Sequence, residues 1–148
     1  MTKNPKQAPP DVIFFEVKDS TNKQWCISET IQVLYDKGHS VMICTPSLTA
    51  AQYVDDLLWR MPMDSFIPHG ISHIPTLEKI VISTHSKNLN KAEILFNLGP
   101  SIVSEGYVTI YEFMDLTHPD KTQLSIKKKE LYEKQSCPVT IQTSVSGS

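Results

Sequence analysis

The chain has 148 residues, 40% of them apolar, and a formal net charge of −2 with charged residues of both signs. That length suits one domain, which can bury a hydrophobic core. The near-neutral charge excludes a bulk nucleic-acid binder, because phosphate contacts require a basic surface. No apolar run approaches the roughly 20 residues of a membrane span, and the polar N-terminus does not resemble a signal peptide, so we expect a cytoplasmic protein without membrane contact.

The cysteines argue against a disulfide framework. Cys26, Cys44 and Cys137 are odd in number, lie far apart and form no C-x-x-C pair. A thiolate zinc site is therefore not expected either. We interpret Cys26 and Cys44 as small buried apolar side chains.

The first half of the chain alternates strand and helix patterns. Residues 12–17 and 41–44 are short apolar runs, typical of strands covered on both faces. A helix capped within residues 20–22 follows the first run, and a helix capped by Ser47 follows the second and ends near Pro62. This alternation predicts an α/β fold with parallel pairing and right-handed crossovers.

The second half begins with an irregular connection over 62–75, interrupted by prolines and Gly70. Strands are predicted at 79–83, 93–98 and 107–114, which brings the sheet to about five strands. A last helix is predicted to start at Pro119, with Thr117 or His118 near its cap, and to end before Pro138. We expect a single domain over 12–136, with a flexible leader at 1–11 and a flexible tail at 137–148.

Sequence motifs for catalysis or cofactor binding are missing. The turn after the first strand, residues 18–23, has no glycine for a dinucleotide fingerprint or a P-loop. His69 and His73 lie among prolines and glycine, where a four-residue spacing fixes no metal geometry. Adjacent Asp55 and Asp56 point about 100° apart on a helix. We therefore expect no catalytic, cofactor-binding or metal-binding residues, and no cofactor.

One enzymatic alternative stays open, because catalytic sets are assembled in space rather than in sequence. A small α/β enzyme or nucleotide-binding protein would have its site at the carboxyl ends of the strands, near Asp19, Thr45 and Thr84.

The segment 57–69 reads LLWRMPMDSFIPH. It resembles the signature of the chi subunit of DNA polymerase III, in which a helix ending in Leu-Trp leads to a Ser-Phe-x-Pro-His segment. The resemblance extends over roughly 12–132 and includes the order of elements. It implies a Rossmann-like α/β domain, with helices on both faces of a mainly parallel sheet and no nucleotide-binding loop.

The resemblance also implies a function, that of a non-catalytic accessory subunit. Such a subunit links the clamp-loader complex to single-stranded-DNA-binding protein in DNA replication, without specific nucleic-acid binding of its own. The signature residues Trp59, Phe66, Pro68 and His69 are then expected to contact the psi subunit or an equivalent clamp-loader protein. Aromatic anchors of this kind tend to carry interface energy, although packing of the loop onto the domain would also explain them.

The last helix is the second expected partner site. In chi proteins a basic, partly apolar surface here takes the acidic tail of single-stranded-DNA-binding protein, which points to Met114, Lys127, Lys128, Lys129 and Tyr132. A solvated charge run would explain these lysines equally well. Chi proteins carry arginine here, and lysine cannot make arginine's bidentate contacts, so a weaker tail interaction or another partner is an alternative.

Overall fold

The computed structural model describes residues 8–61 and 66–143. Segments 1–7, 62–65 and 144–148 lie outside the described residues. They include most of the predicted leader, the end of the predicted tail, and positions 62–65 of the signature segment.

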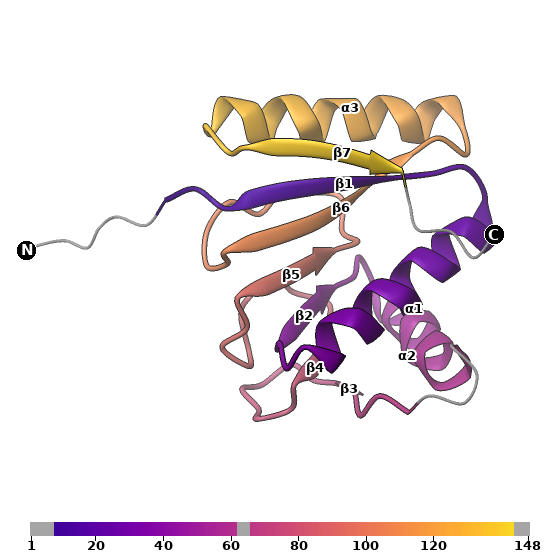
Figure 1. Ribbon diagram of the computed structural model, residues 1–148, viewed down its shortest axis with the longest axis vertical. Helices are drawn as coiled ribbons and strands as arrows, with labels where there is room; N and C mark the ends of the chain where they lie inside the picture. The colour runs from indigo at the N-terminus through magenta and orange to yellow at the C-terminus, as the bar shows by residue number, and fades with distance from the viewer. Residues whose placement is uncertain (1–7, 62–65, 144–148) are drawn as a thin grey trace, which may run out of the picture.

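Strands and helices alternate along most of the described chain (Figure 1). Their order is β1 (Asp11–Val17), α1 (Ser20–Asp36), β2 (Val41–Cys44), α2 (Leu48–Arg60), β3 (Gly70–Ile71), β4 (Ile80–Ser83), β5 (Ile94–Asn97), β6 (Thr109–Asp115), α3 (Pro119–Lys134) and β7 (Val139–Thr143). All of the strands join one sheet in the order β3-β4-β2-β5-β6-β1-β7, and every pair is parallel. This confirms the predicted α/β class and parallel sheet.

The described sheet has seven strands rather than about five. One addition, β3, is a two-residue strand inside the connection that was predicted to be irregular. The other, β7, lies within 137–148, the segment predicted to be a flexible tail, and part of the described portion of that segment forms this strand. Its residues are mostly exposed, so no apolar alternation marks it in the sequence; β7 is held by backbone pairing with β1.

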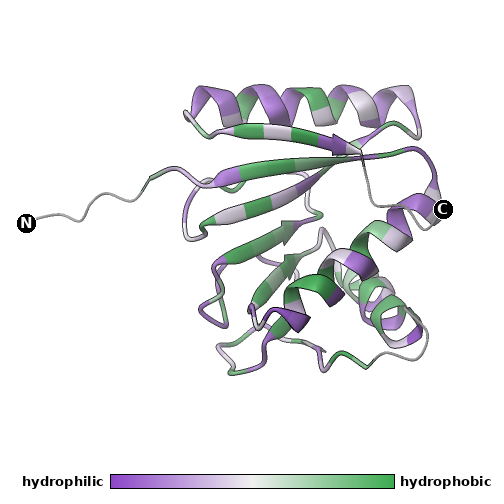
Figure 2. Ribbon diagram, in the orientation of Figure 1, coloured by the Kyte–Doolittle hydropathy of each residue, from purple (hydrophilic) through white to green (hydrophobic). Residues whose placement is uncertain are grey.

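Helices cover both faces of the sheet (Figure 1). Consecutive residues of β2 point to opposite faces, so that Ile43 packs in the core beneath α1 and α2, while Met42 packs in the core that includes Tyr132 of α3. Figure 2 shows the inner strands apolar along most of their length and α3 largely hydrophilic. Cys26 and Cys44 are buried, as predicted. Within the described residues, no helix combines the length and apolar character of a membrane span.

Side-chain caps start the first two helices. Asp19 accepts a hydrogen bond from the Asn22 amide at 2.7 Å, one residue before the predicted capping cluster. Ser47 accepts from the Ala50 amide at 3.1 Å, as predicted. Such caps satisfy amides that have no partner within the helix.

A buried carboxylate, Glu112 of β6, fixes α3 on the sheet. Lys128 Nζ lies 2.6 Å from Oε1. The Asn97 side-chain amide, at 2.7 Å, and the Tyr132 hydroxyl donate to Oε2. Lys128 also donates to the Gly99 carbonyl at 2.9 Å. Burial raises the pKa of Glu112, although Lys128 acts in the opposite direction. Burial also raises the pKa of Tyr132, so the Tyr132 hydroxyl keeps its proton and donates it to Glu112 in a hydrogen bond. Because an isolated buried carboxylate is costly, these contacts strongly favour one position of α3.

Asp115, at the end of β6, joins this strand to α1 through its carboxylate and to α3 through its backbone amide. Lys23 of α1 donates to its Oδ2 at 2.8 Å, and the Thr117 amide donates to its Oδ1 at 3.0 Å. The Asp115 amide donates to the Ser125 hydroxyl of α3 at 3.0 Å. Burial alone would raise the pKa of Asp115, but the hydrogen bonds from Lys23 and Thr117 outweigh it and lower that pKa.

This shift predicts the pH dependence of stability. A carboxyl whose pKa is lower in the folded state stabilises the fold above its unfolded pKa, near 3.9, and this contribution is lost as the pH falls through the folded value. We expect Asp115→Asn to lower the free energy of unfolding by about 1 to 2 kcal/mol at pH 7. In urea titrations the deficit should shrink toward about pH 2. A deficit that stays constant with pH, or an equal one in the exposed control Asp56→Asn, would contradict this role.

Candidate partner-binding surfaces

Two exposed aromatic side chains lie together at the end of α2. Trp59 is 53% exposed and Phe66 is 68% exposed, and their ring centroids are 5.4 Å apart. Pro68, two residues further on, is also exposed. We call Trp59, Phe66 and Pro68 the aromatic surface. Neighbouring exposed aromatics are unusual on a protein surface and typical of an interaction site.

His69 lies beneath this surface rather than on it. Its side chain is fully buried, and its ring centroid is 4.6 Å from that of Trp59. Nδ1 lies 2.6 Å from the Ile67 carbonyl, and Nε2 lies 3.1 Å from the Asp55 carbonyl. His69 is therefore not exposed in the free chain, and its predicted contact with a partner stays a prediction. The part of the chain that the structure describes holds no group of three or more possible metal ligands.

The three predicted lysines of α3 have different environments. Lys127 is exposed, and no carboxylate among the described residues lies within ion-pair distance of it. Lys128 is engaged by Glu112, and Lys129 is paired with Glu133 at 2.8 Å. The structure thus leaves only Lys127 of the three free to meet a partner's charge.

Met114 and Tyr132, the predicted apolar contacts for the tail, belong to the core. Tyr132 is fully buried, and its ring packs edge-on against Phe14 at 6.0 Å between centroids. Met114 is 6% exposed and lies in the same core cluster. Neither side chain is available to a ligand, because both lie on the sheet side of their elements.

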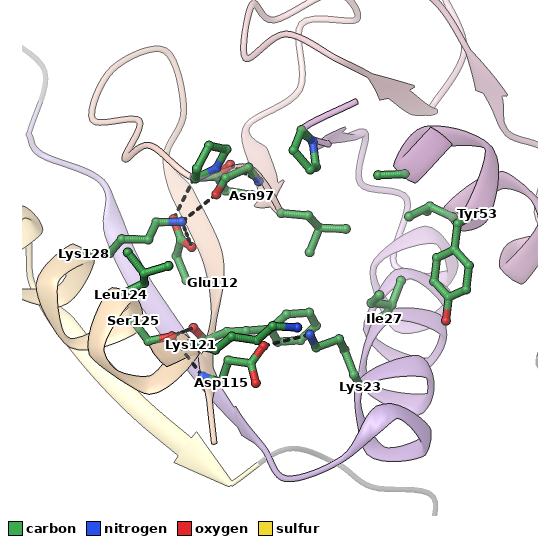
Figure 3. A pocket seen from close by; sticks show the side chains of 17 residues that line it. Lys23, Ile27, Tyr53, Asn97, Glu112, Asp115, Lys121, Leu124, Ser125 and Lys128 are labelled. Carbon is green, nitrogen blue, oxygen red and sulfur yellow. Dashed lines mark hydrogen bonds and ion pairs between the residues drawn. The ribbon is translucent and has the colours of Figure 1, made fainter. Parts of the chain in front are cut away.

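A cleft of about 340 Å³ opens at the carboxyl edge of the sheet, between α1 and α2 on one side and α3 on the other. Figure 3 shows side chains of α1 and α3 lining it from opposite sides. Its walls are mainly apolar, with lysines among the lining residues. The α3 side contributes Lys121, Leu124, Ser125 and Lys128, and the rest of the lining includes Lys23, Ile27, Tyr53, Leu98 and Phe113.

Sequence reasoning missed Lys121 and Leu124. Leu124 is a large apolar side chain, yet it is 63% exposed. The available signal was the helical spacing of Lys121, Leu124 and Lys128, which at i, i+3 and i+7 places all three on one flank. That flank borders the cleft.

In the enzymatic alternative, the described side-chain hydrogen bonds of Asp19 and Thr45 are made with backbone groups. The buried Thr45 hydroxyl donates to the Ser83 carbonyl at 3.1 Å, and Asp19 caps α1. Thr84 is partly exposed and follows β4. The structure does not bring a carboxylate into the described contacts of Thr45.

Neighbouring lysines of α3 give a matched test of these assignments. We expect Lys128→Met to lower the free energy of unfolding by roughly 3 kcal/mol, because it leaves the buried Glu112 carboxylate without its counter-charge. Lys127→Met should change stability by less than about 0.5 kcal/mol, as exposed substitutions generally do. Thermal and urea unfolding of both variants measure the difference. Equal losses in the two variants would show that Lys128 is not a structural residue.

Comparison with known proteins agrees with this layout. The family model of the "DNA polymerase III chi subunit, HolC" matches residues 10–140. The DNA polymerase III subunit chi of Haemophilus influenzae is 27% identical over 103 residues, which span 66% of this chain and 72% of that protein. The family match over residues 10–140 includes the aromatic surface, the cleft and α3. The chain therefore belongs to the DNA polymerase III chi subunit family.

Proposed function

We propose that this chain is a non-catalytic adaptor, which links the clamp-loader complex of DNA polymerase III to single-stranded-DNA-binding protein in the cytoplasm. Family membership over residues 10–140 supports a replication subunit. The observation that carries the adaptor role is the exposed Trp59 and Phe66 pair, which lies on the family signature and outside the core clusters.

The aromatic surface is the proposed contact for a psi-type clamp-loader subunit. Trp59 and Phe66 present two adjacent rings to solvent, and their burial against an apolar groove would supply a few kcal/mol of binding energy. Trp59 contacts both Phe66 and the buried His69 ring, which keeps the surface preorganised and lowers the entropic cost of binding.

The cleft and the adjoining side of α3 are the proposed site for the acidic tail of single-stranded-DNA-binding protein. An extended acidic peptide with an apolar end needs a hydrophobic pocket beside basic side chains. Leu98, Phe113 and Leu124 offer the pocket. Lys121 and Lys127 are exposed and can meet carboxylates, whereas Lys128 and Lys129 are already paired.

The tail site predicts a specific pattern of affinity. Calorimetric titration with a peptide copying the C-terminus of the same organism's single-stranded-DNA-binding protein should show saturable binding that weakens with salt. We expect Lys121→Ala with Lys127→Ala to weaken it roughly threefold to tenfold, from the modest strength of exposed charge contacts. The matched control Lys134→Ala, an exposed lysine near the other end of α3, should bind like the wild type. Unchanged affinity in the double variant, or no binding at low salt, would remove this site.

The aromatic surface predicts loss of a different partner. We expect Trp59→Ala with Phe66→Ala to weaken binding of the same organism's psi subunit at least a hundredfold, because two anchors of about 2 kcal/mol each together correspond to roughly a thousandfold change in affinity. Pull-down and calorimetry measure this loss, while tail binding in the same variant should persist. The exposed apolar residue Leu77 offers a control, Leu77→Ala. Retained psi binding would instead favour another DNA-repair or helicase protein as the partner of this surface.

A further inference from the structure

The buried imidazole of His69 has hydrogen-bond acceptors at both ring nitrogens. Nδ1 lies 2.6 Å from the Ile67 carbonyl oxygen. Nε2 lies 3.1 Å from the Asp55 carbonyl oxygen and 3.3 Å from the Asp55 carboxylate Oδ1. Neither nitrogen faces a donor among the described contacts.

These contacts distinguish the two protonation states. A neutral imidazole carries one N–H, so its other nitrogen would present a lone pair to a carbonyl oxygen in a site without solvent. An unpaired buried polar atom is destabilising. The imidazolium carries two N–H groups, and it satisfies both nitrogens at once.

Charge and ring packing favour the same form. Asp55 of α2 supplies a carboxylate, and the described neighbours in the loop, Phe66, Ile67 and Pro68, supply no charge. The Trp59 ring, with its centroid 4.6 Å from that of the imidazole, is within the distance at which a cation is attracted to an indole. Elsewhere on α2, Asp56 is engaged by Arg60.

We propose that His69 is a positioning residue of the aromatic surface, and that its doubly protonated form, paired with Asp55, holds Trp59 and the 66–69 segment in the partner-binding arrangement. Loss of the second proton removes one of the two hydrogen bonds and loosens the segment from α2. The surface is then ordered at low pH and becomes less ordered as the pH rises. A further consequence is weaker partner binding at higher pH. That consequence rests on the proposed function, whereas the ordering of the surface does not.

The protonation state can be measured without a partner. Nitrogen-15 NMR of the His69 ring distinguishes two N–H groups from one, and in a Trp25→Phe background the emission reports on Trp59, the other tryptophan of the chain. We expect the ring signals and the emission to change together as the pH rises, because both report the loss of the same hydrogen bond. Asp55→Asn should move both transitions to lower pH, since it removes the counter-charge. The exposed His73→Gln is the matched control and should leave both unchanged.

Replacement of His69 separates hydrogen bonding from packing. His69→Gln keeps a side-chain donor but has no charge to titrate, so the emission should no longer depend on pH; circular dichroism checks that the variant is folded. If it is unfolded, Asp55→Asn decides the question. A ring with a single N–H over the whole pH range, or emission that titrates normally in His69→Gln, would overturn the proposal.

Binding of the psi subunit is measured on the same samples. We expect roughly tenfold weaker binding at pH 8 than at pH 5.5, from the loss of one buried hydrogen bond, and no such change in His69→Gln. If the His69 ring signals and the Trp59 emission change together with pH but psi does not bind at any pH, the proposed function is contradicted and the positioning role stands. If psi binds equally at every pH and the His69 ring keeps a single N–H, the positioning role is contradicted and the proposed function stands.

Discussion

The arrangement of this molecule depends on one buried carboxylate, that of Glu112 on β6. A carboxylate in the core is tolerated only when donors surround it, and here they come from β5 and from two turns of α3. The helix is otherwise largely hydrophilic and has few buried residues (Figure 2). Apolar packing alone therefore does little to fix its position on the sheet. Its position in turn defines one wall of the cleft (Figure 3).

The same interaction divides the charges of α3 between structure and recognition. Lys127 and Lys128 are consecutive, yet a rotation of about 100° turns one to solvent and the other to Glu112. A parallel division holds at the aromatic surface, where Trp59 and Phe66 face solvent and His69 is buried behind them. In both places a residue that the sequence suggests for partner binding, Lys128 or His69, holds its neighbours in position.

The sequence predicted the fold class, the parallel sheet and most element positions, because hydrophobic periodicity reports burial directly. It did not reveal β7, whose exposed residues are placed by backbone pairing with β1. For the candidate sites, the signature segment pointed to the exposed Trp59 and Phe66. It could not separate Lys127 from Lys128, or show that Tyr132 is buried, because those distinctions arise from a contact with Glu112, which lies sixteen residues from Lys128 in the chain.

The proposed adaptor role requires that both partners bind at once. Trp59 ends α2, which packs on β3 and β4, whereas α3 packs on β6 and β7 at the other side of the sheet and on its opposite face (Figure 1). Sedimentation velocity of the chain mixed with the psi subunit and single-stranded-DNA-binding protein of the same organism tests this directly. We predict a single boundary that contains all three proteins. Displacement of one partner by the other, or failure of both to bind, would contradict the adaptor role.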